Sequence, residues 1–209
     1  MKKTAFNIQS LALLAAMLSA GNVYAGALDL TTWTATGDVT LGSPTVLNSD
    51  PNYASPADTS SFKDQFGNSG STGATLVSGV ESFSAGTTLT INFDFATQDS
   101  YPVLNDFAYL YFGNSGQGDQ ILFDSSMLAH HLTDSGAQTR NYTFSSNYDG
   151  TIGFVVSNGT VASFTGAQLT ISGVSFSTPA SVPEPEEWAM LLLGLSMMAA
   201  AVRRKQSWL

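Results

Sequence analysis

Apolar and polar residues alternate along most of the chain between residues 26 and 176, which is the pattern of half-buried β-strands. The alternation is clearest over 88–95 and recurs over 150–156, whereas 107–112 is apolar at every position, as in a strand covered on both faces. We expect the apolar members of the two alternating segments to face a common core: Leu89, Ile91, Phe93, Phe95, Ile152, Phe154 and Val156.

Breaks rich in glycine, serine and asparagine separate the predicted strands and mark the turns between them. Residues 147–150 predict a hairpin that joins a strand containing Tyr142 and Phe144 to the strand at 150–156. About eight to ten short strands punctuated by turns are typical of two packed sheets. The sequence therefore predicts an all-β, antiparallel two-sheet β-sandwich of jelly-roll-like form over 26–176.

Two local features depart from regular alternation. The pair Leu169 and Ile171 is out of phase with Val174, and one extra residue near Ser172, a β-bulge, restores the register. Helical periodicity is confined in the body to 125–132, where one or two turns are predicted with Asp124 or Ser125 as the cap.

The N-terminal segment 1–25 has the three parts of a secretory signal. Lys2 and Lys3 supply positive charge, residues 11–18 form an apolar helix too short to span a membrane comfortably, and Ala25 is the small residue after which we expect cleavage by signal peptidase. The alternative is an N-terminal helix buried in the fold.

The C-terminal end has a similar order of parts. Residues 177–187 form a linker rich in proline, serine and glutamate, and 188–202 form an uncharged hydrophobic helix. Fifteen helical residues extend about 22 Å, so 188–202 is predicted as a short transmembrane helix across the inner membrane, with an ordinary C-terminal anchor as the alternative. We expect the tail 203–209 to stay cytoplasmic because it begins with three basic residues: Arg203, Arg204 and Lys205.

The tripeptide Pro183, Glu184 and Pro185, followed by the hydrophobic segment 188–202 and the basic cluster, resembles the PEP-CTERM sorting signal. In that family the membrane protease exosortase recognises the tripeptide and removes the hydrophobic tail. The family occurs in Gram-negative bacteria that make exopolysaccharide. The resemblance implies an exported protein that is anchored in the inner membrane as a precursor and then reaches the cell surface or the extracellular matrix of a biofilm.

Two shorter resemblances lie in the body. Residues 62–66, Phe-Lys-Asp-Gln-Phe, resemble the Phe-x-Asp-x-Phe signature of one PEP-CTERM subfamily, and alternation places Phe62 and Phe66 on the same inward face. Residues 98–109 resemble a loop and strand of bacterial surface and adhesin β-domains, which agrees with the sandwich prediction.

Composition narrows the classes of function. The chain has 209 residues, 43% of them hydrophobic and 11% charged, and no cysteine, which excludes disulfides, cysteine-ligated zinc and thiol catalysis. Between residues 26 and 182, two basic residues oppose thirteen acidic ones, a net charge of −11. Such a body repels phosphate polymers, so we expect no nucleic-acid partner. It also attracts divalent cations.

Catalytic motifs are absent from the sequence. The two histidines, His130 and His131, are adjacent, and there is no nucleophile elbow, zinc-protease motif or phosphate-binding glycine loop. We therefore expect no enzymatic activity, no catalytic residues and no cofactor. A glycosidase with paired carboxylates stays open as an alternative, because any two of the thirteen acids can lie at the required separation.

Calcium is the one ion that the acidic loops suggest. Asp99 and Asp106 flank the loop at 101–102 and are the candidate ligands, since Ca²⁺ prefers carboxylate oxygens. The alternative is that these are solvated turn aspartates.

The sequence thus favours a non-enzymatic surface or matrix protein of an exopolysaccharide system. The alternative is a carbohydrate-binding or adhesin module, calcium-dependent or not, in which flat aromatic rings stack on sugars. The candidate rings are Trp33, Tyr53, Tyr101, Tyr109, Tyr111 and Tyr148, and the alternative for most of them is packing in the core or on a sheet face.

Overall fold

The computed structural model describes residues 24–50, 52–98, 106–113, 118–129, 132–159, 166–179, 189–190 and 192–198. The chain divides into two compact units, one of which is Ala25–Thr178. The other consists of Met1–Tyr24 and Pro179–Leu209, and its described part is helical at 189–190 and 192–198. Among the residues described, no helix has the length and apolar character needed to cross a membrane.

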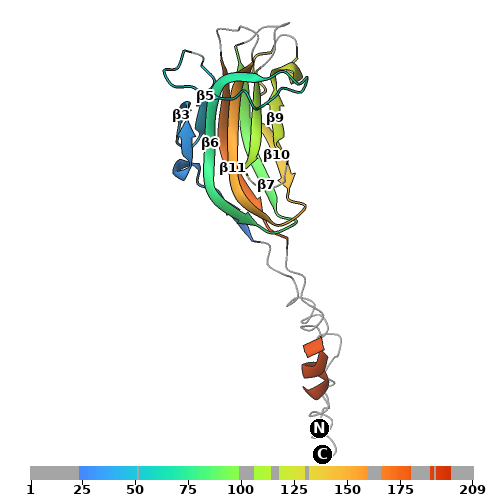
Figure 1. The fold of residues 1–209 in the computed structure, drawn as a ribbon. Helices are drawn as coiled ribbons and strands as arrows, with labels where there is room; N and C mark the ends of the chain where they lie inside the picture. The colour runs from blue at the N-terminus through green and yellow to red at the C-terminus, as the bar shows by residue number, and fades with distance from the viewer. Residues whose placement is uncertain are drawn as a thin grey trace, which may run out of the picture. The chain divides into compact units, whose positions relative to one another are not determined.

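The body, Ala25–Thr178, is a sandwich of two antiparallel sheets whose strands run along its long axis (Figure 1). The first sheet has the strand order β10-β7-β12-β4-β3, with β1 paired to β12. Its members are β1 (Ala25–Ala27), β3 (Asp38–Thr40), β4 (Thr45–Asn48), β7 (Thr88–Thr97), β10 (Gln138–Thr143) and β12 (Ala167–Ser177).

The second sheet has the order β2-β6-β11-β8-β9, with β5 paired to β6. Its members are β2 (Thr34–Thr36), β5 (Ala57–Asp58), β6 (Gly70–Phe83), β8 (Phe107–Gly113), β9 (Gln120–Asp124) and β11 (Tyr148–Gly159). From β9 to β12 the chain changes sheet at each connection, the jelly-roll type of winding. Two short 3₁₀ helices complete the body: η1 (Leu30–Thr32) and η2 (Ser125–Met127). The predicted two-sheet β-sandwich is confirmed.

The core lies between the two sheets, where alternation had predicted it. All seven apolar residues expected to face inward from β7 and β11 are at most 2% exposed. The bulge in β12 is also confirmed: the register with β7 shifts between Ile171 and Gly173, and Val174 is then buried on the same side as Leu169. Burial of these side chains is the main force that holds the sheets together.

Aromatic rings fill one end of the core. Phe83 stacks on Phe144 with 5.1 Å between ring centroids, and Tyr142 packs on Phe112 at 4.5 Å. Burial raises the pKa of the neighbouring Tyr148 to about 12, and its hydroxyl donates a hydrogen bond to the Thr151 carbonyl. Offset and edge-on ring pairs of this kind add to the stabilisation from area alone.

The prediction of a hairpin at 147–150 is wrong. β10 pairs with β7 in the first sheet, whereas β11 pairs with β6 and β8 in the second. The connection between β10 and β11 therefore crosses the sandwich, because Phe144 and Tyr148 both turn into the core. Within the predicted range 125–132, the described residues form one turn, η2, with Asp124 as the cap: its carboxylate accepts the Ser126 N–H at 2.9 Å.

Candidate functional site

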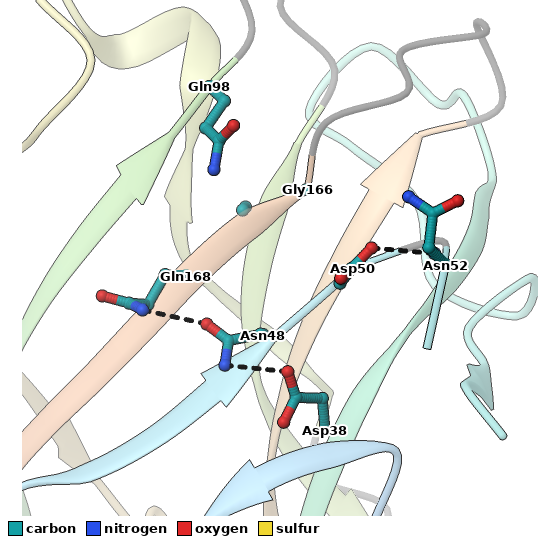
Figure 2. Close-up of a pocket in the computed structure, with 8 residues that line it drawn as sticks. Asp38, Asn48, Asp50, Asn52, Gln98, Gly166 and Gln168 are labelled. Atoms are coloured by element: carbon teal, nitrogen blue, oxygen red, sulfur yellow. Dashed lines mark hydrogen bonds between the residues drawn. The ribbon is translucent and has the colours of Figure 1, made fainter. Parts of the chain in front are cut away.

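A hollow of about 340 Å³ opens on the outer face of the first sheet (Figure 2). Its walls come from the ends of β3, β4, β7 and β12 and from the loops that follow or precede them. The lining residues are Asp38, Asn48, Asp50, Asn52, Gln98, Gly166, Ala167 and Gln168.

Strand register builds the floor of the hollow. Asn48 on β4 lies directly opposite Asp38 on β3 and Gln168 on β12. The Gln168 amide donates to the Asn48 side-chain oxygen at 2.9 Å, and the Asn48 amide donates to the Asp38 carboxylate at 3.1 Å. Figure 2 shows these three side chains in line across neighbouring strands. Since each amide is oriented by its neighbour, the row presents hydrogen-bonding groups in fixed positions.

A close approach of two backbone segments shapes the wall of the hollow. Ser49, which is fully buried, accepts the Ala167 N–H on its hydroxyl at 2.7 Å. A side chain on Gly166 would place its Cβ 2.6 Å from the Ser49 carbonyl group, so only glycine fits there without movement. At the rim, the Asp50 carboxylate accepts the Asn52 N–H at 2.8 Å and closes a local turn.

The hollow is acidic and rich in amides. Of its eight lining residues, all of which the structure describes, two are ionisable and both are aspartates, Asp38 and Asp50. Amide N–H groups and carboxylate oxygens at fixed positions are suited to binding a ligand that carries several hydroxyl groups. Because both aspartates are negatively charged, the same lining is unfavourable for anions.

A pair of carboxyl groups lies farther along the same face of the sheet. Burial and the neighbouring carboxyl of Asp134 raise the pKa of Asp94. Asp94 also accepts the Ser135 hydroxyl at 3.3 Å, and Asp134 accepts the Gly136 N–H at 2.5 Å.

Of the two calcium candidates, only Asp106 lies among the described residues. Asp106 is fully buried; its carboxylate accepts the Thr97 hydroxyl at 2.6 Å, and its N–H donates to the Ser125 hydroxyl at 3.1 Å. These contacts fasten the end of β7 to η2. Asp99 lies outside the described residues, among which no group of three or more potential ligands is placed to hold a metal ion.

Three of the six candidate sugar-stacking rings pack inside the body, which is the alternative that the sequence left open. Trp33, Tyr109 and Tyr148 are buried, because each packs in or against an apolar cluster instead of facing solvent. Tyr111 is half-buried, Tyr53 is exposed, and Tyr101 lies outside the described residues. The row of Asp38, Asn48 and Gln168 was missed. Its sequence signal is polar residues at outward positions of two consecutive strands, β3 and β4, and of the distant strand β12.

The Phe-x-Asp-x-Phe segment has a different arrangement from the one predicted. Phe62 packs on Tyr109 over the outer face of the second sheet, with 5.4 Å between ring centroids, whereas Phe66 is 69% exposed. Asp64 separates the two by closing a turn: its carboxylate accepts the N–H groups of Phe66 at 2.9 Å and Asn68 at 2.7 Å. Alternation fails there because the chain turns instead of continuing as a strand.

The predicted processing residues are only partly described. Ala25 is the first residue of β1 and lies opposite Ser177, the last residue of β12. The sorting tripeptide Pro183, Glu184 and Pro185 and the basic cluster Arg203, Arg204 and Lys205 lie outside the described residues, as do His130 and His131.

Ala25 and Ser177 bring the N-terminal strand and the end of β12 together at one end of the body. Gln168 of the hollow lies near the other end of β12, nine residues before Ser177, a distance of about 30 Å in an extended strand. The hollow therefore opens far from the point where the chain leaves the body.

No protein-family model matches the sequence, and no curated protein matches it. Several solved structures are similar in fold. A family two carbohydrate esterase from Cellvibrio japonicus matches with a TM-score of 0.38 and 12% identity over 79% of this chain and 36% of that chain. The xylan-binding module CBM15 matches with a TM-score of 0.40 and 9% identity over 77% of this chain and 99% of that chain. A CBM4 structure matches with a TM-score of 0.38 and 14% identity over 72% of this chain and 95% of that chain.

Proposed function

We propose that this protein is an exported, non-enzymatic β-sandwich that binds a polysaccharide of the cell surface or extracellular matrix through the hollow on its first sheet. The observation that carries the proposal is the hydrogen-bonded row of Gln168, Asn48 and Asp38. Sugar hydroxyl groups donate and accept hydrogen bonds, and this row offers amide donors beside carboxylate acceptors. Because the side chains already hold one another, little conformational entropy is lost when a ligand binds.

The position of the hollow also supports a surface role. The order of sorting tripeptide, hydrophobic segment and basic cluster resembles a signal for exosortase. In this proposal the segment 188–202 holds the precursor in the inner membrane until exosortase cuts the chain and releases the body. The chain leaves the body at the Ser177 end of β12, and the hollow lies near the Ala167 end. The hollow and the point where the chain leaves the body therefore lie at opposite ends of β12.

The test is a glycan array with the exported protein, followed by calorimetry on the glycans that bind. Asn48→Ala removes the middle of the row and is expected to weaken binding at least about tenfold, the equivalent of 1.4 kcal/mol. The matched control is Asn141→Ala, an exposed asparagine on β10 of the same sheet. A matrix protein without a defined ligand would show no binder on the array, and release of new reducing ends from the glycan would instead indicate an enzyme.

Processing is tested separately by the intact mass of the protein in the culture medium, with and without the sorting protease of the host. We expect a mass that begins after Ala25 and ends near Pro183 to Pro185 when the protease is present. A mass that includes the tail in both cases would make 188–202 an ordinary anchor.

A further inference from the structure

The hollow continues into a row of outward residues that crosses the whole first sheet. Beyond Gln168, the register places Ala96 of β7 in the same row, and Ala96 pairs in turn with Asp134. Backbone hydrogen bonds hold this last segment beside β7: the Thr97 N–H donates to the Thr133 carbonyl, and the Ser135 N–H donates to the Phe95 carbonyl, both at 2.8 Å.

We infer that this row, Asp38, Asn48, Gln168, Ala96 and Asp134, is a binding track that runs across the strands, and that its ligand is the interior of a linear, uncharged glycan chain. The inference rests on the proposed function and specifies its ligand.

The length of the row is the first argument. Neighbouring strands in a sheet are about 4.8 Å apart, so four steps from Asp38 to Asp134 cover about 19 Å. That is longer than a single sugar ring and suits several linked rings. β3 is the last strand in the order on one side, and on the other side no described strand pairs beyond Asp134. A track that reaches both edges of the sheet lets a chain continue past it, which favours internal segments over chain ends.

The variation in side-chain size along the row is the second argument. Ala96, the fourth residue of the row, has the smallest side chain of the five and lies between the longer Gln168 and the Asp134 carboxyl, so the row is low at this position. The adjacent outward row, two residues along each strand, runs through Val46, Thr170 and Asp94. Val46 and Ala96 provide apolar surface for the C–H face of a sugar, and the polar groups on either side bind its hydroxyls.

Charge is the third argument, and it selects against anionic glycans. The ionisable residues along the two rows and the rim are Asp38, Asp50, Asp94 and Asp134, and none of the described residues in these rows is basic. A polyuronate or a phosphate-bearing chain would place negative charge beside several carboxylates, which costs binding free energy. Neutral hydroxyl groups donate to the same carboxylates without this cost.

The experiment measures affinity against chain length for the exported protein. The probes are neutral gluco-, xylo- and manno-oligosaccharides from disaccharide to hexasaccharide, and alginate as the anionic chain. For the series that binds, we expect affinity to rise with each added sugar until the chain covers the row and then to level off, with alginate weaker than the neutral chain.

Two variants test the part of the row that lies outside the hollow, which consists of Ala96 and Asp134. Ala96→Arg fills the low position between Gln168 and Asp134 and is expected to lower hexasaccharide affinity about tenfold or more. Asp134→Ala, at an exposed position, is expected to remove the gain from the longest chains in the same way. The matched control is Ala35→Arg, an exposed alanine on β2 of the second sheet.

The outcomes separate this inference from the proposed function. Equal affinity for all lengths, with Asn48→Ala abolishing binding and Ala96→Arg and Asp134→Ala without effect, would overturn the track and leave the hollow as a site for one sugar. Tighter binding of alginate than of neutral chains would overturn the charge argument. No binding of any probe or array glycan would overturn the proposed function itself.

Discussion

Ser49 and Ala167 hold each other through a pair of hydrogen bonds at the edge of the hollow. The Ser49 N–H donates to the Ala167 carbonyl at 2.8 Å, and the Ala167 N–H donates to the Ser49 hydroxyl at 2.7 Å. Both residues are buried, so water does not replace these bonds. The end of β4 is thereby fixed against the start of β12, and the shape of the hollow is set before any ligand arrives.

Replacing Ser49 by alanine removes the acceptor of the Ala167 N–H. Because a buried donor without its partner loses about 1–3 kcal/mol, we expect Ser49→Ala to lower the free energy of unfolding by that amount. Urea denaturation measures it. The control, Ser172→Ala, removes a hydroxyl that bonds the Asn92 carbonyl at an exposed position and should change stability by less than about 0.5 kcal/mol. Equal effects of the two substitutions would contradict the role given to Ser49.

A substitution at Gly166 tests the contact between the Ser49 and Ala167 segments by introducing a steric clash. In Gly166→Ala the new Cβ meets the Ser49 carbonyl group, so the two segments must separate, and we expect a loss of about 1–3 kcal/mol together with weaker glycan binding. Gly173→Ala is the matched control, since nothing lies within 4 Å of a Cβ at that position. Thermal unfolding and calorimetry follow both effects. Unchanged binding by a folded Gly166→Ala protein would show that the wall does not shape the site.

The two phenylalanines of the Phe-x-Asp-x-Phe segment are expected to differ in their contribution to stability. Phe62→Ala removes a half-buried ring that packs on Tyr109 and Tyr111 and should cost about 2 kcal/mol, below the range for a fully buried phenylalanine. Phe66→Ala removes an exposed ring and should change the free energy of unfolding by less than about 0.5 kcal/mol. Chemical denaturation of the two variants compares them directly, and equal losses would mean that Phe66 is also covered.

The raised pKa of Asp94 predicts that the stability of the protein depends on pH. This pKa is raised by burial and by Asp134, so the carboxyl is more easily ionised in the unfolded chain than in the fold. The stability contributed by this group is fully present below the unfolded pKa, about 3.9, and is lost as pH rises through the folded value. We expect Asp94→Asn to raise stability at neutral pH, by less than about 1 kcal/mol because solvent screens the pair.

The stability difference between Asp94→Asn and the parent protein should shrink as pH falls into the acid range, as followed by thermal unfolding. The control is Asp58→Asn, at a carboxyl whose pKa is shifted in the opposite direction. The Ser60 N–H and hydroxyl lower the pKa of Asp58, so this substitution should bring no gain in stability at neutral pH. A gain for Asp94→Asn that persists unchanged at acid pH would point to packing instead of charge.

Local alternation predicted the strands well where one face of the strand is buried. The alternate apolar residues of 89–95 and 152–156 point inward as expected, and the bulge beside Ser172 follows from the change of phase in the sequence. A period of two residues is a property of the strand itself, so it is readable without knowing which strand lies next to it.

Pairing between strands was not readable in the same way. β10 and β11 look like a hairpin because they are close in sequence, yet they belong to different sheets, since Phe144 and Tyr148 gain more burial between the sheets than a tight turn would allow. The sequence could not separate exposed from buried aromatic candidates for a related reason: a tyrosine in a strand has the same local pattern whether its face meets solvent or another apolar cluster.

The sequence by itself determined the strands, their inward faces and the acidic character of the body, because alternation and charge are properties of the chain. Only the tertiary structure decided the candidate site. The row combines residues from three distant parts of the chain, Asp38 and Asn48, Ala96 and Asp134, and Gln168, which become neighbours through the register of antiparallel strands. Register depends on how the two sheets bury their inner faces together, and that is a property of the whole fold.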